Sequence, residues 1–148
     1  MTRQELTEHI FDEYSVEPDY PFRMDDVTCV FRHPDNRKWF GIAMQVPYKT
    51  LGIPKAGTVD ILNVKCDPLI LGTTRNKPGF RPAYHMNKDK WITILLDGTA
   101  EKEEITALLD MSWQMTKTKT QKKLKDHYQA KISKNVLKNG TLIILMLI

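Results

Sequence analysis

The chain lacks long apolar runs, and it lacks a recognisable targeting segment. Its 148 residues contain no apolar stretch near the roughly 20 residues that span a bilayer, and the longest one, 142–148, is far shorter. The first residues are polar, so no secretory signal is expected. We therefore expect a cytoplasmic protein without a membrane partner.

Motifs of common catalytic sites are also missing. No glycine-rich phosphate loop and no Gly-x-Ser-x-Gly pattern occur, and the only serines are Ser15, Ser112 and Ser133. The four histidines form no His-x-x-x-His frame, and the two cysteines are far apart and are expected as reduced, buried thiols. We predict no catalytic residue, no metal, no cofactor and no enzymatic activity.

Two chemical alternatives around Cys66 stay open from the residues alone. Cys66, Asp67 and His85 would offer ligands to a metal if the fold gathered them. Cys66 beside His33 or His85 would form a nucleophilic pair if its thiol pKa were lowered, which a position just before a helix N-terminus favours. The simpler interpretation is that Cys66 is a small packing residue.

Charge is segregated along the chain. The net charge is +4, but residues 1–26 carry −6, residues 27–98 carry +6, residues 99–116 carry −3 and residues 117–148 carry +7. The basic character of the whole chain therefore comes from its tail, and the preceding part is polarised rather than basic. Such polarity influences partner choice and steering, not the fold.

Caps and apolar spacing predict three helices. Thr2 and Glu5 match a capping box, and Leu6, Ile10 and Tyr14 recur every four residues. An Asp-Pro pair begins the second helix, and acidic residues that favour a helix N-terminus begin the third. The predicted helices cover residues 2–14, 67–76 and 99–117.

Five segments rich in β-branched and aromatic residues are predicted as strands, joined by turn residues into hairpins. Pro82 indicates that the fourth lies at a sheet edge, and the segment 48–57 is expected as an exposed loop. The strands cover residues 27–32, 38–46, 58–65, 80–84 and 90–96. The order α-β-β-β-α-β-β-α predicts an α+β fold of two layers, with an antiparallel sheet and helices on one face.

We expect a domain over residues 1–117 and a basic C-terminal extension over residues 118–148. Leu124, Tyr128, Ile132 and Val136 recur at four-residue spacing, which is typical of an amphipathic helix. The apolar end, 142–148, is expected to pack on the preceding domain or on another subunit.

Several segments combine aromatic, proline and basic residues in a distinctive order. They are Val30-Phe31-Arg32-His33-Pro34, Lys38-Trp39-Phe40, Leu62-Asn63-Val64-Lys65-Cys66-Asp67-Pro68, Pro78-Gly79-Phe80-Arg81-Pro82-Ala83-Tyr84-His85-Met86-Asn87-Lys88, Trp91-Ile92-Thr93 and Leu96-Asp97-Gly98. The chain resembles the MmcQ/YjbR-like family of small bacterial proteins. This resemblance implies a secretion-chaperone-like (CyaY-like) α+β fold and a proposed DNA-binding role with hairpin wings as the contacting elements. The tail departs from the family pattern.

Basic and aromatic residues gather around two of the predicted turns. Turns reach phosphates that a flat sheet cannot, and aromatic rings stack on unpaired bases. The candidate nucleic-acid-binding residues are Arg32, His33, Arg37, Lys38, Trp39, Arg81, Tyr84, His85, Asn87, Lys88, Lys90 and Trp91. The structural alternative places the tryptophans in the core and pairs the arginines with acidic helices.

Three functions remain open at this point. The first is a non-enzymatic DNA-binding protein with little base preference, helped by its lysine-rich tail. The second is a protein-interaction or chaperone-like module without a nucleic-acid role, which binds a protein partner or itself through the C-terminal extension. The third is a small-molecule or catalytic pocket around Cys66, His33 or His85.

Overall fold

The structure, a computed structural model, describes residues 1–118 and 126–132. The chain divides into two units, Met1–Thr116 and Lys117–Ile148. In the second unit, residues 126–132 are helical; the rest of the expected amphipathic helix and the apolar end 142–148 lie outside the described residues. In the described part of the chain, no helix is both long and apolar enough to cross a membrane.

Three helices form one layer of the first unit. They are α1 (Arg3–Tyr14), α2 (Pro68–Thr74) and α3 (Lys102–Thr116). The predicted capping box is present: the Thr2 hydroxyl accepts a hydrogen bond from the Glu5 amide, and the Glu5 carboxylate accepts one from the Thr2 amide. The predicted cap of α2 is present as well, because the Asp67 carboxylate accepts a hydrogen bond from the amide of Leu69.

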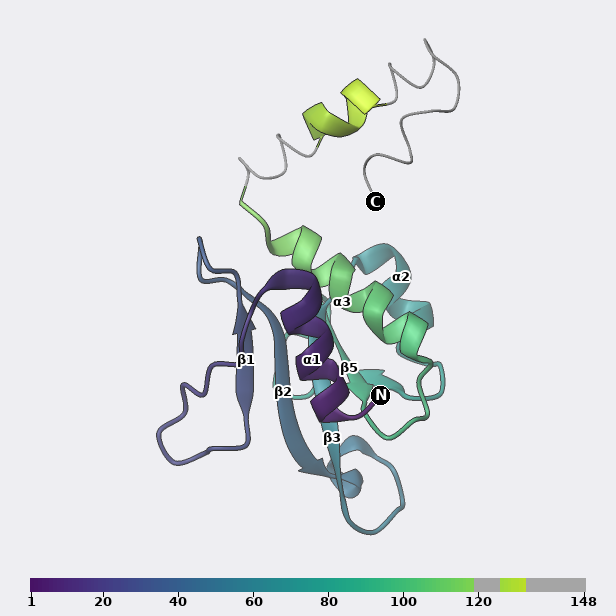
Figure 1. Ribbon diagram of the computed structural model, residues 1–148. Coiled ribbons are helices and arrows are strands. Elements are labelled where there is room, and N and C mark those ends of the chain that lie inside the picture. The colour runs from purple at the N-terminus through teal and green to yellow at the C-terminus, as the bar shows by residue number, and fades with distance from the viewer. Residues whose placement is uncertain (119–125, 133–148) are drawn as a thin grey trace. The chain divides into compact units, whose positions relative to one another are not determined.

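The second layer is a five-stranded sheet in the order β1-β2-β3-β5-β4, with every neighbouring pair antiparallel. Its strands are β1 (Cys29–Arg32), β2 (Trp39–Pro47), β3 (Thr58–Lys65), β4 (Phe80–Pro82) and β5 (Trp91–Leu95). Helices α1 and α3 lie against one face of this sheet (Figure 1). The predicted α+β fold, with its antiparallel sheet and its helices on one face, is confirmed.

The main core lies between the sheet and the helices. Its largest fully buried side chains include Phe31, Phe40, Leu62, Ile92, Ile94, Leu6, Ile10, Ile105 and Leu109. Gly41 permits the close approach at the centre of this layer, because a Cβ atom there would lie 3.3 Å from the ring of Phe31 and 3.4 Å from the side chain of Leu62. The main core therefore belongs to the helix-covered face.

A smaller apolar cluster occupies the other face, which α1, α2 and α3 do not cover (Figure 1) and which we call the helix-free face, where helix means α-helix. It contains Val46, Tyr48, Val59, Ile61 and Leu95. The expectation that the whole segment 48–57 is exposed is wrong at Tyr48, which begins the short helix η1 (Tyr48–Leu51) and is only 7% exposed. Its ring packs in this cluster while its hydroxyl donates to Asp97 at 3.0 Å.

Candidate nucleic-acid interface

Both basic turns leave the sheet at the same end. β1 ends at Arg32 and β2 begins at its partner Trp39, while β3 ends at Lys65 and β5 begins at its partner Trp91. Antiparallel pairing therefore brings the turn 33–38 and the connection 83–90 to the same end of the sheet, the end at which these strands begin or stop. We call these two segments, with the four strand residues just named, the hairpin end.

In the first turn, the arginines share one carboxylate. Arg32 lies 3.0 Å and Arg37 lies 3.8 Å from Asp19, and the Arg32 guanidinium also lies 5.4 Å from the centre of the Trp39 ring. The Arg37 side chain nevertheless stays 63% exposed, and Lys38 is exposed. Arg37 and Lys38 are thus the two accessible cations of this turn.

His33 is not part of this surface. Its side chain is fully buried, and its Nε2 atom lies 2.7 Å from the hydroxyl of Thr116. The ring stacks on Trp113 at 3.9 Å and meets the edge of Phe40 at 5.3 Å. The prediction that His33 contacts nucleic acid is therefore wrong in this structure, because the helix layer covers it.

The second basic segment, 83–90, folds back over the helix-free face and is held there by two buried polar side chains. The Tyr84 amide donates to the Thr93 hydroxyl at 2.8 Å, and the Asn63 side-chain amide donates to the Tyr84 carbonyl at 2.9 Å. The Thr93 hydroxyl in turn donates to Asn63 Oδ1 at 2.5 Å. Both side chains are completely buried, so this triad fixes where the connection runs.

The remaining predicted residues of the connection are mostly accessible. His85 is exposed and stacks on Tyr84 at 3.9 Å with an interplanar angle of 16°. The Asn87 carbonyl accepts from the amides of Lys90 and Trp91, so Asn87 serves the turn itself. Lys88 and Lys90 are exposed.

A shallow pocket of about 250 Å³ lies between η1 and this connection. Arg81 lines it, and Arg81 Nη1 also donates to the carbonyl of Phe80 at 2.8 Å. Arg81 is half-buried, and it shares this pocket with Tyr84, His85 and Lys88 of the connection.

Lys65 is a cation of the hairpin end that the sequence reasoning missed. It pairs with Trp91 in the sheet and is half-exposed, and it lies on β3, the middle strand. The sequence feature that could have indicated it is a basic residue at the end of the largely apolar strand β3. Asp19, Asp35 and Asp89 lie on the flanking segments and reduce the local positive charge without cancelling it.

The Cys66 alternatives find little support. The thiol is fully buried, and burial, with a smaller contribution from Asp67, raises its pKa. The helix N-terminus thus does not yield the lowered pKa that a nucleophile needs. Within residues 1–118 and 126–132, no three His, Cys, Asp or Glu side chains are close enough to share a metal ion.

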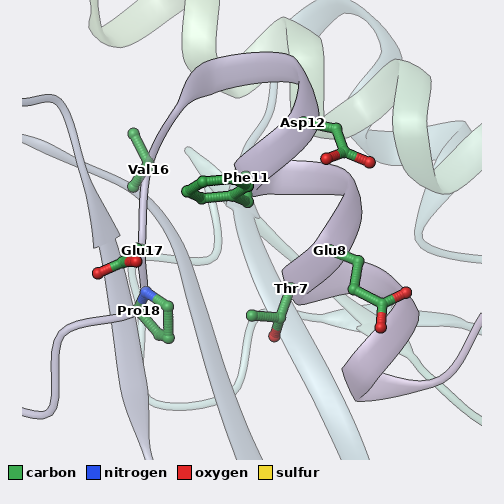
Figure 2. A pocket seen from close by; sticks show the side chains of 7 residues that line it. All are labelled: Thr7, Glu8, Phe11, Asp12, Val16, Glu17 and Pro18. Atoms are coloured by element: carbon green, nitrogen blue, oxygen red, sulfur yellow. The ribbon is translucent and has the colours of Figure 1, made fainter.

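A separate acidic groove lies between α1 and the segment that follows it (Figure 2). It encloses about 600 Å³ and is lined by Thr7, Glu8, Phe11, Asp12, Val16, Glu17 and Pro18. Phe11 is 53% exposed, and carboxylates flank it, with Glu8 and Asp12 on the helix and Glu17 on the other side. Among these described lining residues there is no cation, so the groove is opposite in charge to the hairpin end.

Comparison with known proteins gives consistent matches over the first unit. A family model described as YjbR matches residues 12–115. An uncharacterised protein of Bacillus subtilis, YyaQ, is 38% identical over 117 residues, which are 79% of this chain and 99% of that protein.

Solved structures match the same part of the chain. A crystal structure of a Pseudomonas syringae protein is 40% identical with a TM-score of 0.77, and the match covers 79% of this chain and 100% of that one. A Deinococcus radiodurans protein, DR2400, is 26% identical with a TM-score of 0.59, and the match covers 80% of each chain.

Proposed function

The chain belongs to the YjbR family, and from that premise we propose that it is a non-enzymatic DNA-binding protein that contacts phosphates through its hairpin end. The observation that carries this proposal is the strand register, which brings two basic turns to one end of the sheet with Lys65 between them. We further propose a cytoplasmic location, because that is where a protein of a bacterial cell meets DNA; the relatives reported above are bacterial.

The accessible cations suit phosphates better than bases. Arg37, Lys38, Lys88 and Lys90 are exposed at turn tips, where each would neutralise one phosphate and release counterions. Three of these four cations are lysines, whose flexible point charge gives less geometric selection among base edges than the rigid guanidinium fork of arginine. We therefore propose that the protein binds DNA with weak sequence preference and with an affinity that depends strongly on salt concentration.

The absence of enzymatic activity is part of the same proposal. It is supported by the positions of two of the three groups that the sequence suggested as reactive, Cys66 and His33; the third, His85, is exposed and lines the shallow pocket beside η1. The Cys66 thiol is buried with a raised pKa, and the His33 ring is stacked inside the core. Neither group reaches a ligand from solvent.

The test is a pair of charge-matched variants of the full chain. Lys88→Gln/Lys90→Gln removes two cations of the hairpin end, and Lys49→Gln/Lys102→Gln removes two exposed cations elsewhere. Affinity for a labelled duplex is measured by fluorescence anisotropy at two salt concentrations. With four phosphate contacts, affinity should fall about 150-fold for a fourfold rise in salt, and losing two contacts should reduce that fall to about 12-fold. If both variants change the salt dependence equally, the hairpin end is not the site.

The acidic groove favours a second candidate, a protein-interaction role. Its apolar floor, Phe11, Val16 and Pro18, and its flanking carboxylates fit a basic amphipathic segment of a partner protein. A Lys/Leu amphipathic peptide of about 15 residues should bind the full chain and lose affinity on Asp12→Lys/Glu17→Lys. The matched control is Glu101→Lys/Glu103→Lys, and equal losses in the two variants would mean only generic charge attraction.

A further inference from the structure

The helix-free face carries cations and tryptophans side by side where it meets the hairpin end. Arg32 pairs with Trp39, and Lys65 pairs with Trp91. Residues paired across antiparallel strands lie on the same face. The four side chains therefore form two cation–tryptophan pairs on neighbouring strands of one sheet.

The direction of these side chains follows from the strand alternation. Phe31, next to Arg32, and Ile92, next to Trp91, belong to the helix-side core, so Arg32 and Trp91 point the other way. The register between β1 and β2 shifts between Phe31 and Arg32, which leaves Phe40 without a partner residue on β1. Phe40 packs in the helix-side core, while Trp39 lies beside the Arg32 guanidinium.

The three tryptophans are all partly accessible, but they differ in their surroundings. Trp113 packs against the helix-side core, stacked between His33 and Tyr14 at 3.9 and 4.5 Å. Trp39 and Trp91 are not among the residues of either apolar cluster, and the Trp39 ring meets the edge of Phe22 at 6.4 Å. Trp39 on β2 and Trp91 on β5 are separated by β3 alone, which corresponds to about 10 Å. Lys65 lies on that intervening strand.

Duplex DNA would make little use of such rings, because its bases are stacked inside and its outer surface offers phosphates. A single strand offers both groups at once: base faces that stack on aromatic rings and phosphates that cations neutralise. An alternation of cations and aromatic rings where this sheet face meets the hairpin end is therefore matched to unpaired bases.

We infer that the ligand class is single-stranded nucleic acid, with bases stacking on Trp39 and Trp91 and the backbone held by Lys65 and the hairpin cations. This inference rests on the proposed nucleic-acid-binding function and refines it. The exposed turns contribute phosphate contacts to either form of DNA, whereas the two tryptophans distinguish the single strand from the duplex.

The test measures tryptophan fluorescence and anisotropy together on the full chain, with a thymidine oligonucleotide and a duplex of equal length as probes. The expected result is tighter binding of the single strand and quenching of the tryptophan emission on binding. Trp91→Leu should lower single-strand affinity about 5- to 150-fold and leave duplex affinity within about twofold. Trp91→Phe, which keeps a ring, should recover most of the single-strand affinity and guards against a folding defect.

The outcomes separate the two proposals. If neither probe binds even at low salt, the DNA-binding function itself fails. If the duplex binds as tightly as the single strand, without quenching and without an effect of Trp91→Leu, the phosphate-binding role stands and the single-strand inference is overturned.

Discussion

Replacing Thr93 by valine should destabilise the protein although the two side chains have nearly the same shape. The Thr93 hydroxyl is fully buried, accepts from the Tyr84 amide at 2.8 Å and donates to Asn63 Oδ1 at 2.5 Å. Valine leaves both partners unsatisfied, and each buried unsatisfied group costs about 1–3 kcal/mol. We expect the free energy of unfolding to fall by about 2–6 kcal/mol and Tm to fall by about 10 °C or more.

The measurement is urea unfolding followed by circular dichroism, with Thr58→Val as the matched control. Thr58 is also a strand residue, but it is exposed, so the same change there should alter stability by less than about 0.5 kcal/mol. The variant should also loosen the connection 83–90, seen as faster amide hydrogen exchange at Tyr84. A Thr93→Val cost no larger than that of Thr58→Val would refute the role assigned to this buried triad.

Two further stability predictions concern the loops around β5. Gly79→Ala should lower the free energy of unfolding by about 3 kcal/mol or more, because φ is +86° and the new Cβ would lie 2.6 Å from the Ala100 nitrogen. Thermal unfolding measures this loss. A variant as stable as the natural chain would show that the contact relaxes. For Asp97, burial alone would raise the carboxyl pKa, but hydrogen bonds from Thr99 and Tyr48 lower it overall. A lowered folded-state pKa stabilises the fold above the unfolded value of about 3.9, and this stabilisation is lost as pH falls through the folded value. Asp97→Asn should therefore differ most from the natural chain at neutral pH and least below about pH 3, as measured by urea unfolding across pH; a constant difference would contradict this linkage.

Local rules sufficed for much of the fold. The capping box of Thr2 and Glu5 and the bounds of β3 depend on neighbouring residues, and the structure has both as the sequence predicts. Pro82, which cannot donate to a ladder, lies on the edge strand β4, as expected. The secretion-chaperone-like comparison and the division at residue 117 stay predictions.

Positions fixed by distant contacts escaped sequence reasoning. His33 follows a strand and begins a turn, which favours exposure, yet α3 supplies Trp113 and Thr116 to bury it. Tyr48 lies in a loop-like segment but is held by Asp97 from far along the chain. Asn63 and Thr93, polar residues inside apolar strands, were the local signals that a buried network exists.

The central claim is that the hairpin end, and not the lysine-rich tail, binds DNA. A Pseudomonas syringae relative matched over its whole length covers only 79% of this chain, so a chain ending at Lys117 is expected to fold. The decisive measurement is the affinity of that truncated chain for labelled DNA, beside the full chain, at about 50 and 200 mM salt. Salt-dependent binding by the truncated chain, weakened by Lys88→Gln/Lys90→Gln, is the predicted result. Binding by the full chain alone would contradict the account and assign DNA affinity to the tail as a generic polycation.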